Sequence, residues 1–151
     1  MTRSRPDLTE RGFTLIELLI TVAVIGILAT IAIISFRESM DRAKQRQTMA
    51  NLRSIATAIE AYETDHSFLP EDGITIDTLA TVLAPDVLST VPKQDAWRND
   101  LVYVSPGMNY TLKSFGRNGV EGPALCTRET RDNFDTDILI IDGLFVASPE
   151  S

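Results

Sequence analysis

The sequence has few of the side chains on which catalytic and metal sites usually depend. Its 151 residues include one cysteine, Cys126, and one histidine, His66, so it can form neither an intramolecular disulfide nor a cluster of histidine and cysteine ligands. It contains no recognisable pairing of a nucleophile with a base and no glycine-rich phosphate loop. Basic residues number 14 against 21 acidic ones, whereas a nucleic-acid surface needs clustered lysine and arginine. These absences argue against an enzyme and against a nucleic-acid partner.

Charge is distributed unevenly along the chain. Between Phe13 and Phe36 the only charged residue is Glu17, whereas residues 67–151 carry thirteen acidic and six basic residues. A helix over 13–36 would span roughly 36 Å, enough to cross the ~30 Å hydrocarbon core of a bilayer. A buried core helix of this length would need a larger protein around it than the 115 residues that follow. A signal peptide would end in a small-residue cleavage site, and no such site follows this run. The sequence therefore predicts a membrane-spanning helix followed by a water-soluble head.

The start of the apolar run carries a specific motif, because residues 11–20 read RGFTLIELLI. This segment resembles the prepilin-type cleavage and methylation signature of type IV pilins and type II secretion pseudopilins. The resemblance implies that a membrane prepilin peptidase cuts between Gly12 and Phe13 and methylates the new amino group of Phe13. Residues 1–12 would then be a cytoplasmic leader, and the apolar run would stay on the mature chain.

Glu17 is an acid at a position where charge is expensive. At a helix centre in the bilayer an aspartate costs about 2.5 to 3.5 kcal/mol, and less near an end, so such a charge usually has a partner. After cleavage the amino group of Phe13 is a cation at the start of the helix, where the macrodipole also favours an anion. We therefore expect Glu17 of one subunit to pair with Phe13 of its neighbour during assembly. The alternative is that Glu17 reaches the lipid headgroups from the first turn.

Residues 37–66 contain no glycine or proline and are predicted to continue the same helix as an amphipathic segment. Apolar residues recur there at spacings of three and four, which predicts packing under the head: Leu52, Ile55, Ala56, Ile59 and Tyr62. The helix is expected to end near His66, ahead of Pro70.

The head, residues 67–151, is expected to form a short helix over 76–83 and a small antiparallel sheet. The inward side chains of the short helix are predicted to be Leu79, Val82 and Leu83, and a further turn is expected over 86–90. Strands are predicted over 101–105, 110–115, 137–141 and 144–147, the last two joined in a hairpin by Asp142-Gly143. The predicted fold class is thus α+β, with the second half of a long helix on a small sheet, which is the pilin-like layout.

Parts of the head also resemble the major pseudopilins of type II secretion. Residues 95–99, DAWRN, resemble their Asp-Pro-Trp-Gly-Asn segment but lack its proline and its glycine, and residues 116–122 match a glycine-rich turn. Trp97 is expected to be a packing residue rather than a binding platform.

Major pseudopilins bind calcium in the loop that corresponds to residues 120–136, so the resemblance implies a calcium site here. Calcium takes six to eight oxygen ligands. The expected side-chain ligands are Asn118, Asp135 and Asp137, with carbonyl oxygens from Phe115 and Val120. The alternative is an acidic, solvated loop without an ion, and no cofactor is otherwise required.

The resemblance implies a structural subunit that forms a homo-oligomeric filament, most like the major pseudopilin that drives protein export by type II secretion. Its partners would be prepilin peptidase, an inner-membrane assembly platform, minor pseudopilins and membrane lipid. The head would lie in the periplasm, on a single inner-membrane span, with the filament in the periplasm or at the cell surface. Two alternatives remain: a subunit of a type IV pilus used for adhesion, motility or DNA uptake, and a membrane-tethered periplasmic receptor or enzyme.

Overall fold

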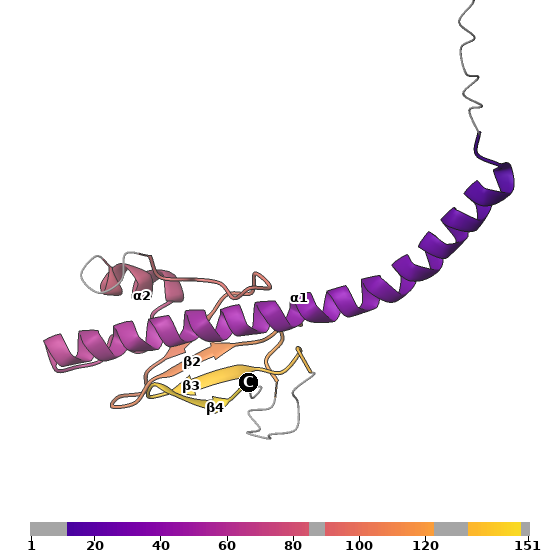
Figure 1. Ribbon diagram of the computed structural model, residues 1–151. Coiled ribbons are helices and arrows are strands. Elements are labelled where there is room, and N and C mark those ends of the chain that lie inside the picture. The colour runs from indigo at the N-terminus through magenta and orange to yellow at the C-terminus, as the bar shows by residue number, and fades with distance from the viewer. Residues whose placement is uncertain (1–11, 85–89, 123–132, 149–151) are drawn as a thin grey trace, which may run out of the picture. The chain divides into compact units, whose positions relative to one another are not determined.

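The computed structural model describes residues 12–84, 90–122 and 133–148. In these ranges the chain forms the helices α1 (Leu15–His66) and α2 (Ile76–Leu83) and the strands β1 (Val102–Val104), β2 (Thr111–Ser114), β3 (Ile138–Ile141) and β4 (Leu144–Ala147) (Figure 1). The predicted α+β fold is confirmed. Residues 1–11 of the expected leader, the expected turn at 86–89 and the loop residues 123–132 lie outside the described residues.

By its internal contacts the chain divides into residues 1–39 and residues 40–151. In the first unit the described residues form the first half of α1, and every one of them is exposed. The second unit contains the rest of α1 together with α2 and the sheet. The core lies in the second unit.

Helix α1 ends at His66 as the sequence predicts. Ser67 takes a left-handed conformation, with φ of 64°, and its N–H donates to Glu63 O at 2.7 Å, which satisfies a carbonyl that the helix end would leave free. The His66 ring stacks on Tyr62 with 4.0 Å between centroids. The only histidine of the sequence thus packs on Tyr62 in the last turn of the helix.

The four strands form one antiparallel sheet in the order β1-β2-β3-β4. Its register aligns Tyr103 with Leu112, Leu112 with Ile140 and Ile140 with Phe145, so these side chains share one face. That face packs with the buried residues of α1, among them Leu52 (Figure 1). The expected stripe is confirmed for Leu52, Ile55, Ala56 and Ile59, which are at most 1% exposed, and Tyr62 is partly buried.

The buried face of α2 differs from the prediction at one position. Leu79 and Leu83 are fully buried, but Val82 is 39% exposed and Ile76 is buried in its place. At 100° per residue, Ile76, Leu79 and Leu83 lie within about 60° of one another around the helix. Val82 follows Leu79 by three positions, but it is turned about 100° away from Leu83 and so lies at the edge of this face. Thr75, the N-cap, accepts a hydrogen bond from Thr78 N, which sets the first turn so that Ile76 faces the core.

The predicted β3–β4 hairpin is confirmed. Asp142 and Gly143 both have positive φ, 46° and 76°, as a two-residue turn requires. The Asp142 carboxylate accepts a hydrogen bond from Tyr110 N at 2.9 Å. A Cβ at position 143 would overlap the Glu60 carboxylate of α1, so glycine permits both the turn and its close approach to the helix.

Candidate functional site

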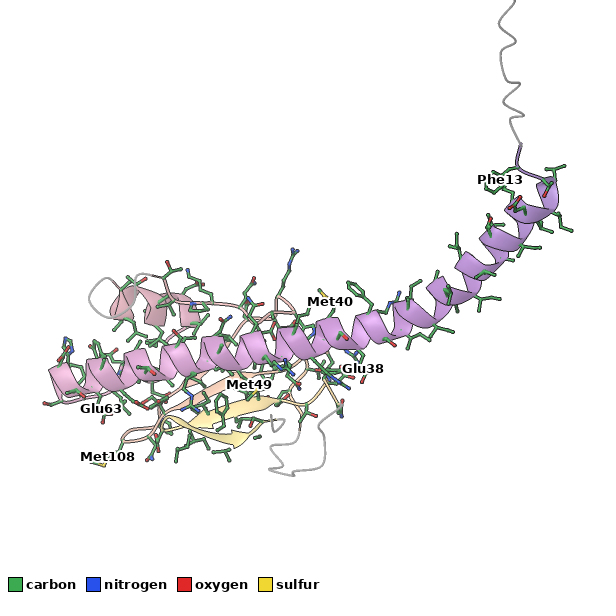
Figure 2. All side chains as sticks on the ribbon, in the orientation of Figure 1. Phe13, Glu38, Met40, Met49, Glu63 and Met108 are labelled. Carbon is green, nitrogen blue, oxygen red and sulfur yellow. The ribbon has the colours of Figure 1, made fainter. Side chains whose placement is uncertain are left out.

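The two residues at the expected cleavage point, Gly12 and Phe13, precede α1 and are exposed. A Cβ at Gly12 would meet no atom within 4 Å, and the Phe13 side chain is 76% exposed (Figure 2). Among the described residues, none therefore requires glycine at position 12. Any such requirement comes from a partner that binds this segment.

Thr14 caps the start of α1, which places Glu17 in its first turn. Thr14 Oγ1 accepts a hydrogen bond from Glu17 N at 3.3 Å, and Thr14 O accepts one from Leu18 N. The pair follows the Thr-x-x-Glu spacing of a capping box. Because a threonine at this position satisfies a free N–H group of the helix end, the cap holds Glu17 at a defined place beside the positive end of the helix.

The first half of α1 is long and apolar enough to cross a membrane. An 18-residue window has a mean hydropathy of 2.8 and none of it is buried, and the large side chains from Leu15 to Phe36 are exposed. Both of its threonine hydroxyl groups are satisfied within the helix: Thr21 Oγ1 donates to Leu18 O and Thr30 Oγ1 donates to Gly26 O. Apolar surface that the chain itself leaves uncovered can be covered by lipid or by other helices.

In the head, the buried carboxylate of Asp95 organises the segment that follows it. Asp95 is 5% exposed, and its oxygens accept hydrogen bonds from Trp97 N at 2.9 Å, Asn99 N at 2.8 Å and Ser114 Oγ at 3.0 Å. A buried carboxylate needs such donors because it has lost its water. Asp95 thereby fixes residues 95–99 against β2.

Asn99 extends this arrangement to the turn after β2. Its Nδ2 donates to Gly116 O at 2.6 Å, and a Cβ at Gly119 would come within 2.7 Å of Asn99 Oδ1. Gly116 and Gly119 both have positive φ. The DAWRN segment and the glycine turn, which are separate motifs in the sequence, thus form one structural unit.

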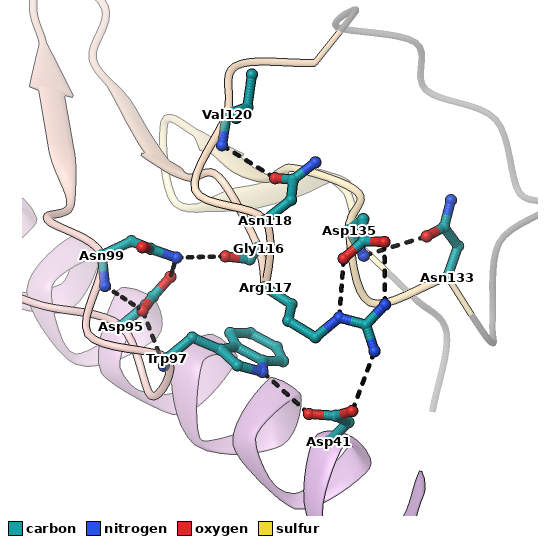
Figure 3. A network of polar contacts seen from close by, with 10 residues as sticks. All are labelled: Asp41, Asp95, Trp97, Asn99, Gly116, Arg117, Asn118, Val120, Asn133 and Asp135. Carbon is teal, nitrogen blue, oxygen red and sulfur yellow. Dashed lines mark hydrogen bonds and ion pairs between the residues drawn. The ribbon is translucent and has the colours of Figure 1, made fainter. Parts of the chain in front are cut away.

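Trp97 and Arg117 connect residues 95–99 and the glycine turn to α1 (Figure 3). The Trp97 indole Nε1 donates to Asp41 Oδ1 at 3.1 Å, and Arg117 Nη1 lies 3.2 Å from Asp41 Oδ2. Arg117 also makes a two-pronged contact with Asp135, Nε to Oδ1 at 2.9 Å and Nη2 to Oδ2 at 3.0 Å. Hydrogen bonding to Asp135 and, to a lesser extent, Asp41 raises the pKa of Arg117.

The three side chains expected to bind calcium, those of Asn118, Asp135 and Asp137, have other partners in the structure. Asn118 Oδ1 accepts a hydrogen bond from Val120 N at 3.0 Å, and both oxygens of Asp135 contact Arg117. Asp137 Oδ2 accepts from Gly122 N at 3.0 Å and lies 3.3 Å from Lys113 Nζ. Within the described ranges, no three His, Cys, Asp or Glu side chains are close enough to share an ion.

Lys113 brings a second cation to this region. Its side chain is 12% exposed, and its Nζ lies 2.7 Å from Glu121 Oε1 as well as near Asp137. Burial lowers the pKa of Lys113, but hydrogen bonds to Glu121 and Asp137 outweigh it, so the net shift is upward. Among the described residues, Asp137 Oδ1 is buried without a hydrogen-bond partner.

The roles expected for Gly12, Phe13 and Glu17 stay predictions, and sequence reasoning missed other residues that hold these segments in place. The Thr14 cap could have been found from its spacing to Glu17. The contacts of Asp41 with Trp97 and Arg117 join residues 56 and 76 positions apart, and nothing in the local sequence marks them. Trp97 is half-buried and uses its indole N–H, so it is a packing residue that also makes a polar link.

Comparisons with known proteins agree with this geometry. Residues 35–129 match the protein-family model described as type II secretion system (T2SS), protein G, and residues 8–33 match the prokaryotic N-terminal methylation motif. No solved structure gives a significant match.

The similar proteins include secretion and pilus subunits. The type II secretion system core protein G of Vibrio cholerae is 29% identical over 124 residues, covering 75% of this chain and 84% of the relative. The fimbrial protein EcpC of Eikenella corrodens is 31% identical over 125 residues, covering 82% and 77%. The type IV major pilin protein PilA of Myxococcus xanthus is 48% identical over 62 residues, covering 41% and 28%. Since the protein G model covers more than half of the chain, including the second half of α1 and much of the head, the chain belongs to the type II secretion system protein G family.

Proposed function

We propose that this chain is a structural subunit, of the major pseudopilin type, in the pseudopilus that drives protein export by type II secretion. The observation that carries the proposal is the protein G match over residues 35–129, because it includes the head as well as the helix. The methylation motif over residues 8–33 supports processing by a prepilin peptidase.

The structure supports this role through the free surface of α1. The exposed apolar side chains from Leu15 to Phe36 suit a segment that lies in lipid before assembly and against other helices afterwards. The head has its own core on the second half of α1, so the first half of the helix does not have to cover it. Gly12 and Phe13 are exposed and precede the helix, which leaves the cleavage point accessible to a peptidase.

Assembly is proposed to pair Glu17 of one subunit with the amino group of Phe13 in its neighbour. The Thr14 cap holds Glu17 in the first turn of α1. A carboxylate and an ammonium group attract each other strongly where water is excluded, and removing one partner leaves the other charge unpaired at several kcal/mol. Such a pair would favour one axial register between subunits over others.

The topology and the partners follow from the same proposal. The span would anchor the chain in the inner membrane, with residues 1–12 in the cytoplasm and the acidic head in the periplasm. Polymerisation would require an inner-membrane assembly platform and minor pseudopilins. The role is structural rather than enzymatic, in keeping with the type II secretion relatives named above.

A type IV pilus subunit is the second candidate function. The observation that favours it is the similarity to fimbrial protein EcpC over 82% of this chain. The high identity to the major pilin PilA extends over only 28% of that relative, so it concerns a segment rather than a whole subunit.

Deletion of the gene in its native bacterium distinguishes these functions. We expect the deletion strain to retain type II substrates inside the cell while its surface pili and surface motility stay normal. The wild-type gene should restore export. Loss of surface pili with normal export would instead identify a pilus subunit, and normal pili with normal export would contradict both.

A further inference from the structure

Arg117 lies between two acidic residues that are distant in the sequence. Its guanidinium contacts Asp135, in the segment before β3, and Asp41, on α1 (Figure 3). Its backbone N–H also donates to Phe134 O at 2.8 Å. One side chain thus links the turn after β2, the segment before β3 and the long helix, all within the unit formed by residues 40–151.

The described residues around Arg117 do not fit a calcium ion at Asp135. A divalent cation bound to that carboxylate would sit beside a guanidinium whose nitrogens are 2.9 and 3.0 Å from the same oxygens. The two charges would repel each other, and each Asp135 oxygen already has a donor. Asp137 has one unpartnered oxygen among the described residues, but its other oxygen lies 3.3 Å from Lys113 Nζ.

We propose that Arg117 supplies the positive charge that holds the segment around Asp135 to α1, and that this segment is held without a bound metal ion. The guanidinium suits this position because its planar fork matches a carboxylate through two parallel bonds and leaves a third nitrogen for Asp41. Asp41 in turn accepts the Trp97 indole N–H, which connects the clamp to the segment that Asp95 organises. The Arg117 clamp, defined as Arg117 with Asp41 and Asp135, is independent of which filament the chain forms.

Solvent exposure limits how much the clamp can contribute. The side chains of Arg117, Asp41 and Asp135 are 46%, 19% and 39% exposed, and exposed ion pairs are weak and screened by salt. The two-pronged contact with Asp135 and the additional contact with Asp41 should make the clamp contribute more to stability than an isolated surface ion pair does. It should therefore shift the melting temperature modestly and in a salt-dependent way.

The test is thermal melting of the full-length chain in detergent, followed by the fluorescence of Trp97, the only tryptophan. Wild type should melt at the same midpoint in millimolar calcium and in chelator. Arg117→Gln should lower the midpoint by about 2–5 °C at low salt, and this loss should shrink in molar sodium chloride. Arg117→Lys should recover only part of it, because lysine keeps the charge but lacks the fork.

Two controls make the result specific. Lys93→Gln breaks a single exposed ion pair with Asp77 and should change the midpoint by less than about 1 °C. The double variant Arg117→Gln with Asp135→Asn should melt close to Arg117→Gln alone, because both changes remove the same contact. A higher wild-type midpoint in calcium would overturn the proposal, as would an Arg117→Gln midpoint no lower than that of Lys93→Gln.

Discussion

Asp95 is expected to be the most costly acidic residue to remove from the head. Its buried carboxylate accepts three hydrogen bonds of 3.0 Å or less, two from backbone N–H groups and one from Ser114. Asp95→Ala would leave these donors without a partner at about 1 kcal/mol each, or about 3 kcal/mol in total. That is a large share of the roughly 5–15 kcal/mol that stabilises a typical domain. We expect the melting midpoint to fall by about 10 °C.

The assay is again Trp97 fluorescence of the full-length chain in detergent, because this side chain lies in the head and reports its unfolding. Asp100→Ala is the matched control: it makes the same substitution five positions away at an exposed residue, which accepts one hydrogen bond from Gln94. Asp95→Asn should cost about 1 kcal/mol, since its amide oxygen can still accept from the backbone. If Asp95→Ala melts within about 3 °C of Asp100→Ala, the assignment of Asp95 as the organising residue is wrong.

Four further predictions concern other parts of the molecule. Glu17→Val should be processed and inserted but should form few filaments, because the amino group of the neighbouring Phe13 loses its partner; wild-type filament levels in sheared fractions would refute the pairing. Gly12→Val should stay uncleaved on immunoblots although the described residues around position 12 leave room for a side chain. Normal cleavage of this variant would show that the peptidase does not need glycine before the cut. Arg98 has a φ of 74°, so Arg98→Gly should stabilise the head by about 0.5–1 kcal/mol, whereas Arg98→Ala should not; equal midpoints for the two variants would contradict the strain. Burial raises the pKa of Tyr110 above its ordinary value of 10.0, so its contribution to stability is complete below about pH 10 and is lost as the pH rises further. The melting midpoint should therefore fall at alkaline pH, and Tyr110→Phe should weaken this fall. An unchanged fall in the variant would exclude Tyr110 as its source.

Local patterns in the sequence were sufficient to predict most of the secondary structure. Helix α2 and the β3–β4 hairpin lie where the apolar spacing and Asp142-Gly143 place them. The strands β1 and β2 are shorter than predicted by one residue at each end, because strand pairing stops at residues 102 and 104 and at residues 111 and 114, and the apolar pattern does not mark where pairing stops. Val82 was misplaced because three apolar residues near the end of a short helix do not by themselves define its buried face.

The backbone conformation of single residues and the contacts between distant segments were not predictable in the same way. Arg98 departs from the glycine of the family motif, and the structure shows why glycine suits the position: its φ is positive. The partners of Arg117 depend on how the segment before β3 folds back toward α1, and an arginine next to Asn118 gives no sign of that. The charge of a predicted ligand can be read from a sequence, but the cation that already neutralises it cannot.

The mass of the mature chain in native membranes tests the central claim most directly. If the chain is a prepilin-type subunit, mass spectrometry of the purified protein will find an N-terminus at Phe13 that carries one methyl group. The Gly12→Val variant, analysed in parallel, should retain residues 1–12 and lack the methyl group. A wild-type chain that keeps its leader, or one cut at another position, would contradict the account.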